Sequence, residues 1–506
     1  MRRPAKWMHA FACRDMFAVL CCAVVISGAV LAYVALGPGW PQNHEGVASV
    51  HRLMAVVGQW RSGNFIPVWS SVLHAGMGSP MPGLYHKSFM YVSAAIYALT
   101  GGVKAAVVGA LLFFSIVGFL GAAFAIMAAF GRSSWPAGLL AGALLLTSNY
   151  ATTDWLVRGA FAEYSAVAAI SLLLVPLVHF VRGGHWSKWI GVCIAFLVVS
   201  HAGLALFVPP LVVVALIVAQ RVHVLHWRSL LRRIAQSAVL TLALVAPFLM
   251  PLIAFSGYND NRGLLSEGLL PASNFISPVK YIWDAEWRWG AHADSFTVQF
   301  DLYVLPVLIA CIALLVVLKK KAPDASDSPR PGHRPVDATR AVLLFLTISF
   351  CVYFFLQMPF AWPIYELVPG ARYIQLPWRL QAYTTVLAAL MAAVLTVSLW
   401  RTRRRAGYIS DCGSGGNVGA GFARQQPGGK RDPICSYFRH ARLPAGGNGL
   451  SGRWRVRAPA SSRNRSAAIC AFGRVVCDAA GWWLPGGGRW PSALRRSESA
   501  RLHRIL

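Results

Sequence analysis

The sequence predicts an all-α, polytopic membrane protein of about ten transmembrane helices, and two observations carry this prediction. The chain of 506 residues is 56% hydrophobic and 13% charged, and its mean hydropathy is +0.53. Its apolar residues gather in runs of roughly 20, the length that a helix needs to cross a bilayer. Lipid offers backbone groups no hydrogen-bond partner, so such runs cross as helices. A soluble fold is therefore excluded.

The first apolar run follows a basic N-terminal flank and covers Phe17–Leu36. A cleaved signal peptide is the alternative, but the run is long and lacks a small-x-small cleavage site. We therefore expect an uncleaved first span. Nine further spans are expected at about residues 104–130, 136–149, 164–182, 187–202, 205–220, 234–255, 302–318, 340–358 and 382–400.

The segment after the first span is more polar. Glu45–Ser62 has apolar residues at helical spacing, which is typical of an amphipathic helix on a membrane surface. Glycines and prolines between Gly76 and Gly83 then interrupt any helix. Phe89–Leu99 is apolar but short for a span, so we expect it to be interfacial or re-entrant.

Lysine and arginine in the short loops predict the orientation, because cytoplasmic loops are enriched in both. With the N-terminus in the cytoplasm, the dense clusters Arg228–Arg233 and Lys319–Lys321 lie inside. A full span at Phe89–Leu99 would place both clusters outside. The expected external segments are residues 37–103, 150–163, 256–301 and 359–381, with a tight turn near His201.

The chain divides into a predicted multi-span domain, residues 1–405, and a basic tail, residues 406–506, rich in glycine and arginine. The tail is either disordered or a frame-shifted translation of a GC-rich gene, which we favour. In a soluble domain, a net charge of +29 would indicate a protein that binds nucleic acid. Here the basic residues lie mostly in the tail and in the short loops, so no nucleic-acid partner is expected. The ten cysteines show no paired metal spacing. We expect no cofactor, and we leave a divalent metal open.

Three polar features are expected on the external face. Glu45 opens the amphipathic helix, where it either caps the positive helix end or acts as a general base. Arg158 and Glu163 lie five residues apart at the mouth of a span. They form either an anchoring ion pair or a site in which Arg158 binds a phosphate oxygen. His201 ends a helical hairpin, where a histidine is more often a satisfied polar residue than a catalyst.

Gln375, Trp378 and Arg379 lie just before the last apolar run. Trp378 with a snorkelling Arg379 fits an aromatic belt at the membrane surface. The alternative is one polar site shared with Glu45 and with the Arg158–Glu163 stretch, since all three are expected on the same face.

Three separated motifs carry a resemblance. They are Arg158–Glu163, Gln375–Arg379, and the early Gly63–Trp69 followed by Gly76–Pro80, and they look like bacterial membrane proteins labelled "6-pyruvoyl-tetrahydropterin synthase-related". Those proteins are similar in turn to the GT-C class of polytopic glycosyltransferases. The likeness covers roughly residues 15–400. The label implies no pterin chemistry, because no histidines are spaced like a pterin-synthase zinc site.

The resemblance implies a bacterial inner-membrane enzyme with a polyprenyl-phosphate sugar as donor, and with a glycan or protein acceptor. It implies that Glu45 is the base and that Arg158 or Arg379 holds the lipid phosphate. The family usually has aspartate followed by histidine in its first loop, where this chain has Asn43-His44-Glu45. The alternative functions are a transporter or flippase of lipid-linked saccharide and a non-catalytic assembly subunit. A transporter would show related halves, and the sequence has no convincing internal repeat.

Overall fold

The structure is a computed structural model in which residues 13–41, 43–222, 225–255, 270–284, 297–320, 335–368 and 370–414 are described. Helices make up most of these residues, and they contain no β-strand beyond an isolated bridge between Ser70 and Ser79. All of them belong to the first of two compact units, Met1–Gly419. The prediction of an α-helical protein with several membrane-spanning helices is confirmed.

Seven helical segments of the described chain are long and apolar enough to cross a membrane, and each coincides with a predicted span. Three other predicted spans contain shorter helices, so the count of ten is not confirmed. The long segments are α1 (Cys13–Leu36), α5 (Val103–Phe130), α8 (Phe161–Val181), α10 (Ala202–Ala205) with α11 (Val208–Val222), α12 (Trp227–Phe255), α15 (Pro335–Leu356), and η9 (Pro377–Leu380) with α17 (Gln381–Ser414). The shorter ones are α6 (Trp135–Leu146), α9 (Trp189–Ser200) and α14 (Val304–Lys320).

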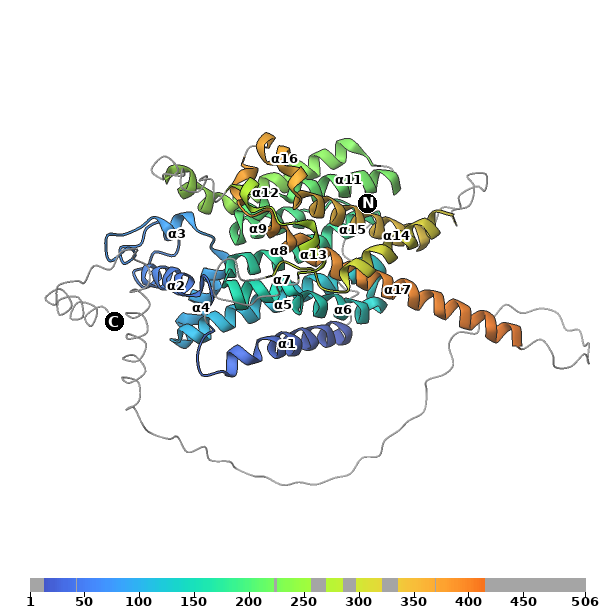
Figure 1. The fold of residues 1–506 in the computed structure, drawn as a ribbon, viewed down its shortest axis with the longest axis horizontal. Helices are drawn as coiled ribbons and strands as arrows, with labels where there is room; N and C mark the ends of the chain where they lie inside the picture. Colours follow the sequence, from blue (N-terminus) through green and yellow to red (C-terminus); the bar gives the residue numbers. More distant parts are fainter. Residues whose placement is uncertain are drawn as a thin grey trace, which may run out of the picture. The chain divides into compact units, whose positions relative to one another are not determined.

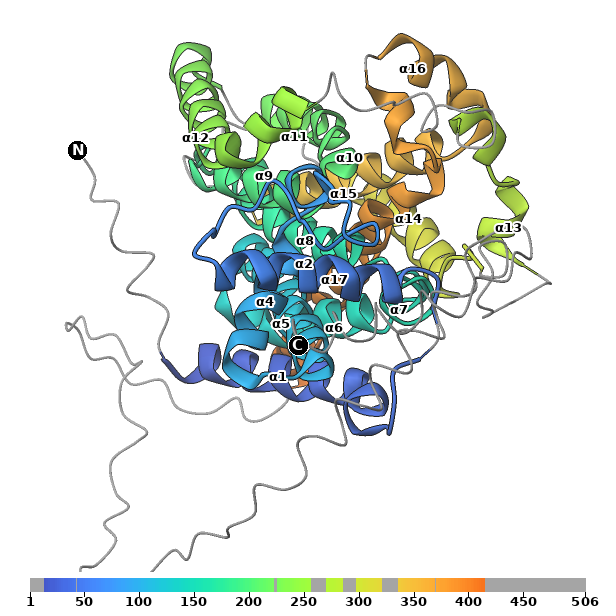
Figure 2. The ribbon, with the colours of Figure 1, turned by 90° about the vertical axis from the view of Figure 1, so that its left-hand side faces the viewer.

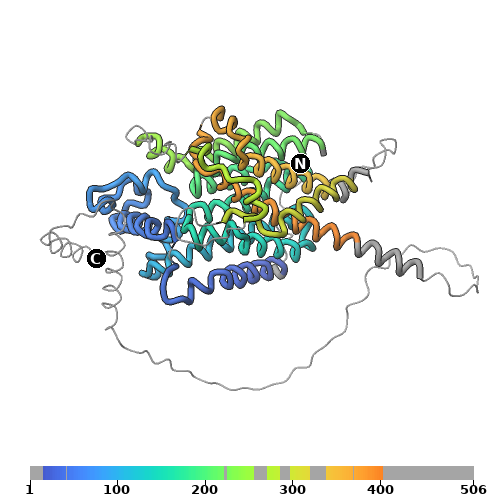
Figure 3. Tube along the Cα trace, viewed as in Figure 1, coloured from blue at the N-terminus to red at the C-terminus, as the bar shows by residue number. Residues whose placement is uncertain are grey.

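Helices α5 and α8 form the centre of the described bundle (Figures 1 and 2). They cross closely at Gly121, where a Cβ atom would lie 2.8 Å from the backbone nitrogen of Leu172. Small residues at such crossings allow helix backbones to approach within a membrane. Helix α17 comes from the other end of the chain and packs against α6, α8 and α15 (Figure 3).

The predicted amphipathic helix is present as α2 (Gly46–Arg61). It packs against α4 (Ser88–Thr100), which contains the segment expected to be interfacial or re-entrant (Figure 2). Leu53 and Val57 of the predicted apolar face are buried, whereas Val47 is 56% exposed. The buried face of α2 is therefore only part of the predicted stripe, because α4 covers one side of the helix.

Helix α17 continues to Ser414, past the predicted domain boundary at residue 405. The rest of the predicted basic tail lies outside the described residues. Its assignment as disordered or frame-shifted stays a prediction.

Candidate functional site

The first polar loop lies directly against the Arg158–Glu163 stretch. The backbone N–H of Glu45 donates to the carbonyl oxygen of Arg158 at 2.8 Å, and that of His44 donates to Val157 at 3.2 Å. Gly159 makes this approach possible, since a Cβ atom there would lie 2.7 Å from Asn43 Oδ1 and 2.8 Å from the nitrogen of Gly46. Its φ of +68° also favours glycine. Two of the three predicted polar features therefore meet.

Arg158 ends an unusual helical turn. Residues Thr153–Arg158 form a π-helix, a geometry that occurs mostly as short insertions and frequently at functional sites. The turn follows α7 (Asn149–Thr152) and precedes Gly159 and α8. It brings Asp154 and Arg158 into contact, and the first turn of α8 adds Glu163.

Four charged side chains form a buried network with Tyr150. Arg158 pairs with Asp154 and, at 3.0 Å, with Glu163. Arg379 Nε lies 3.4 Å from the same Glu163 oxygen, Oε2. The Tyr150 hydroxyl donates to Glu163 and also lies 3.0 Å from the carbonyl oxygen of Arg379. The network therefore joins the Arg158–Glu163 stretch to the Gln375–Arg379 stretch.

The network is nearly dry, with Asp154 fully buried and Glu163 only 2% exposed. Burial raises the pKa of Asp154 well above its usual range, and the charge of Glu163 raises it further. Burial alone would lower the pKa of Arg158, but Glu163 and Asp154 raise it above its usual value. Arg158 is thus a fixed cation between two carboxyl groups.

Trp378 contacts this network, and Gln375 lies three residues before it in the chain. The Arg158 guanidinium carbon lies 4.6 Å from the ring centroid of Trp378, within cation–π range. Trp378 is buried in the described chain, so its ring packs inside the protein. Gln375 has φ +62° and ψ −47°, a positive φ that is uncommon outside glycine and recurs at functional sites. Arg379 Nη1 donates to Ile374 at 3.3 Å.

Glu45 occupies the N-cap position of α2, but its side chain makes no capping hydrogen bond. Its carboxylate instead lies 3.5 Å from Arg52 Nη1, and the Glu45 side chain is 37% exposed. Arg52 in turn lies over the ring of Tyr85, 4.0 Å from its centroid. Glu45 is therefore an accessible carboxylate beside the buried network.

His201 stacks on His86, a residue that the sequence did not suggest. Their ring centroids lie 4.3 Å apart at an angle of 20°. His201 Nδ1 accepts the N–H of Leu204 at 3.1 Å, which caps α10. Burial lowers the pKa of His201 to about 3, and Arg379 and Arg158 contribute in the same direction. Burial likewise holds the pKa of His86 well below its usual value, helped by His201.

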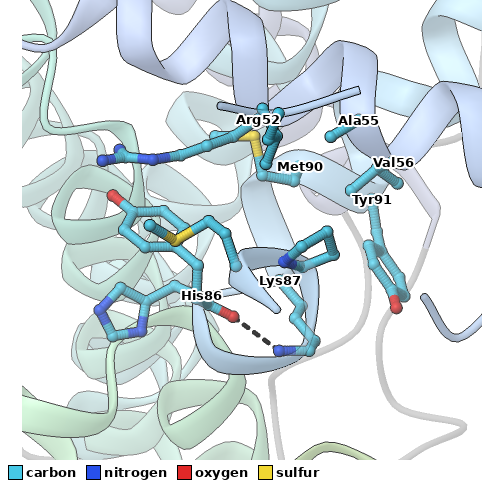
Figure 4. A pocket seen from close by; sticks show the side chains of 11 residues that line it. Arg52, Ala55, Val56, His86, Lys87, Met90 and Tyr91 are labelled. Atoms are coloured by element: carbon cyan, nitrogen blue, oxygen red, sulfur yellow. Dashed lines mark hydrogen bonds between the residues drawn. The ribbon is translucent and has the colours of Figure 1, made fainter. Parts of the chain in front are cut away.

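A narrow pocket opens beside these residues (Figure 4). Arg52 and His86 point to one side of it, whereas Ala55, Val56 and Tyr91 line the other. Lys87 also lines it, but its amine donates to the carbonyl oxygens of Gly83 and Tyr85 at 3.0 and 2.6 Å. Burial lowers the pKa of Lys87 to about 8. The pocket therefore has a polar side and an apolar side.

Within the described residues, no three histidine, cysteine, aspartate or glutamate side chains come together as a metal site. Whether the protein uses a metal stays open.

The sequence missed Tyr150, Asp154, Arg52 and His86. Asp154 had a usable signal, because it lies four residues before Arg158 and such pairs meet on a helix. Tyr150 had none, since its contact with Arg379 joins residues 229 positions apart.

Fold and site together define an α-helical membrane protein with a buried polar network next to an accessible acid. A scan against protein-family models and a search of the curated proteins found no match.

Proposed function

We propose that the protein is a bacterial inner-membrane glycosyltransferase that takes its sugar from a polyprenyl phosphate at the periplasmic face. The observation that supports it most is the meeting of three distant polar stretches. The first loop with Glu45 is hydrogen-bonded to Arg158, and Glu163 contacts both Arg158 and Arg379. This is the arrangement that the resemblance to GT-C enzymes implies for the base and the phosphate-binding arginine.

The burial of each side chain suggests its role. Arg379 keeps 17% of its side chain exposed, and we assign it to the donor phosphate. Arg158 is held by two carboxyl groups and by Trp378, so we assign it a positioning role. Glu163 orients both arginines. Glu45 is the exposed carboxylate and is assigned as the general base.

The proposed reaction needs one proton acceptor and one anion-binding group. Glu45 takes the proton of an acceptor hydroxyl as its oxygen attacks the anomeric carbon. The bond from that carbon to the phosphate oxygen breaks, and polyprenyl phosphate leaves with the electron pair. Arg379 stabilises the negative charge on this leaving group. We propose no metal or other cofactor for this step.

We also propose that α6, α9 and α14 complete a ten-span frame with a GT-C-like first loop and a cytoplasmic N-terminus. Helices of 12 residues, such as α6 and α9, are shorter than a bilayer requires. Helix α7 follows α6 after two residues and supplies part of the remaining length, whereas α10 belongs to the next span.

Cleavage of the donor tests the function. The purified full chain is placed in liposomes with a polyprenyl phosphate that carries a radiolabelled sugar, together with candidate glycan and peptide acceptors. We expect time-dependent release of free polyprenyl phosphate, with label transferred to an acceptor. A transporter would move the intact donor between leaflets without cleaving it. An assembly subunit would do neither, and either result contradicts the proposal.

A further inference from the structure

The hydrogen bonds of His86 and His201 fix where each ring carries its proton. His201 Nδ1 accepts the N–H of Leu204 at 3.1 Å, and His86 Nδ1 accepts the N–H of Ala202 at 3.4 Å. A neutral imidazole has one acceptor nitrogen and one N–H donor. Since Nδ1 is the acceptor in both rings, each ring presents its N–H at Nε2. The pair therefore offers two stacked donors.

Cations surround this pair. His86 lies next to Tyr85, whose ring is 5.0 Å from that of His86 and is covered by Arg52. Besides burial, the positive charges of Arg379 and Arg52 lower the pKa of His86. Those of Arg379 and Arg158 lower the pKa of His201. A neutral ring in such a place adds a hydrogen-bond donor without adding another positive charge.

The charges around the pair leave an excess of cations. The network and the pocket together contain four basic side chains, those of Arg52, Lys87, Arg158 and Arg379. They contain three carboxyl groups, those of Glu45, Asp154 and Glu163. Lys87 is occupied by two carbonyl oxygens. Arg52 pairs with Glu45 at 3.5 Å while both are partly exposed, so this pair can open to a ligand. The favoured ligand is an anion.

We propose that His86 and His201 are neutral N–H donors that bind a phosphate group together with Arg52 and Arg379. This rests on the proposed function, in which that phosphate belongs to the lipid-linked donor. The pocket lining places the apolar side chains of Ala55, Val56 and Met90 next to Arg52 and His86. A free phosphate ion shares the same head chemistry, and the experiment separates the two sources.

Two substitutions at each histidine separate the donor role from the structural role. Asparagine places an oxygen near the position of Nδ1 and removes the donor at Nε2. Glutamine places an amide N–H near Nε2 and loses the acceptor at Nδ1. His86→Asn and His201→Asn should therefore keep the fold and lose binding. His86→Gln and His201→Gln should keep binding and lose stability.

Binding is measured by calorimetry on the full chain in nanodiscs, with farnesyl phosphate, farnesol and inorganic phosphate as probes. Each asparagine variant should bind farnesyl phosphate about 10- to 100-fold more weakly than wild type, with an unchanged Tm. This factor corresponds to the loss of one hydrogen bond to a charged group. Each glutamine variant should bind within about 3-fold of wild type at a lower Tm. Asparagine variants that bind like wild type would overturn the proposal.

The probes also distinguish this site from the proposed function. Farnesyl phosphate binding well above farnesol supports a phosphate site, whether or not sugar transfer is observed. Inorganic phosphate binding as tightly as farnesyl phosphate supports the anion site and contradicts a lipid-linked donor. Equal binding of farnesol and farnesyl phosphate overturns the site.

Discussion

Arg158 contacts two carboxyl groups and an indole ring while almost completely buried. Taking charges out of water is costly, so a buried ion pair is tolerated only when each charge is well matched. Glu163 meets this demand by accepting hydrogen bonds from Arg158 and Tyr150 and by pairing with Arg379, whose Nε lies 3.4 Å away. The network therefore depends on Arg158 much more than a surface ion pair depends on either partner.

Replacing Arg158 by methionine should destabilise the protein by roughly 3–5 kcal/mol, because Asp154 and Glu163 then lose their shared buried cation. Thermal unfolding of the full chain in detergent, followed by tryptophan fluorescence, measures the loss. The matched control is Arg132→Met, which removes an ion pair with Asp15 at 3.1 Å whose side chains are 31% and 42% exposed. That change should cost less than about 1 kcal/mol. Equal losses in both variants would contradict the dependence of the buried network on Arg158.

At this scale, the sequence predicted the pairing of Arg158 with Glu163 as one of two alternatives, and the two side chains are in contact. It did not predict that Asp154 shares Arg158. Hydropathy carries no signal for this contact, although the four-residue spacing of Asp154 and Arg158 does. His86 was missed because its contacts join distant parts of the chain. His201 lies 115 positions from it, and Ala202, whose N–H it accepts, lies 116 positions from it.

The start of α2 is held in place by its contact with the turn before α8. Two backbone hydrogen bonds, from His44 and Glu45, cross this contact, and Gly159 leaves room for Asn43 and Gly46. The position of Glu45 therefore depends on a residue of another helix. The sequence predicted α2 as a helix, yet it could not predict this docking, because Gly159 reads as an ordinary helix breaker.

Gly159→Ala should displace the first loop. Its Cβ atom would meet Gly46 N at 2.8 Å, and alanine at φ +68° is strained by about 1–2 kcal/mol. Hydrogen–deuterium exchange should increase across residues 43–50. Gly63→Ala is the matched control, with φ +84° and no atom within 4 Å of the added Cβ. Faster exchange across residues 43–50 in the control alone, or in neither variant, would contradict the docking.

For the whole molecule, apolar runs predicted the seven long spans, because hydropathy and length alone define them. They also predicted the end of α9, because the expected span at 187–202 and the tight turn near His201 match a helix that ends at Ser200. They placed the end of α6 less well, since the expected span reached residue 149 and the helix ends at Leu146. Ser148 accepts the N–H of Ala151 and starts α7. Such an N-cap starts a new helix inside an apolar run, so a window average passes over it.

The predicted orientation can be tested by cysteine labelling in intact cells. Asn64→Cys lies in the first loop and should react with a membrane-impermeant maleimide from outside. Lys188→Cys lies at the predicted cytoplasmic end of the span 187–202 and should react only after permeabilisation. Labelling of the wild-type chain gives the background. The reverse pattern would place Glu45 on the cytoplasmic side and contradict a periplasmic site.

In the proposed mechanism, Glu45 acts as a base beside a phosphate-binding cluster. The most direct test is the rate of polyprenyl phosphate release by Glu45→Gln in the liposome assay, together with its affinity for farnesyl phosphate. We expect a release rate at least about 100-fold below wild type, since a general base contributes this much or more. The affinity for farnesyl phosphate should equal or exceed that of wild type, because Arg52 loses the carboxylate that competes with the ligand. A release rate equal to wild type would show that Glu45 is not the base.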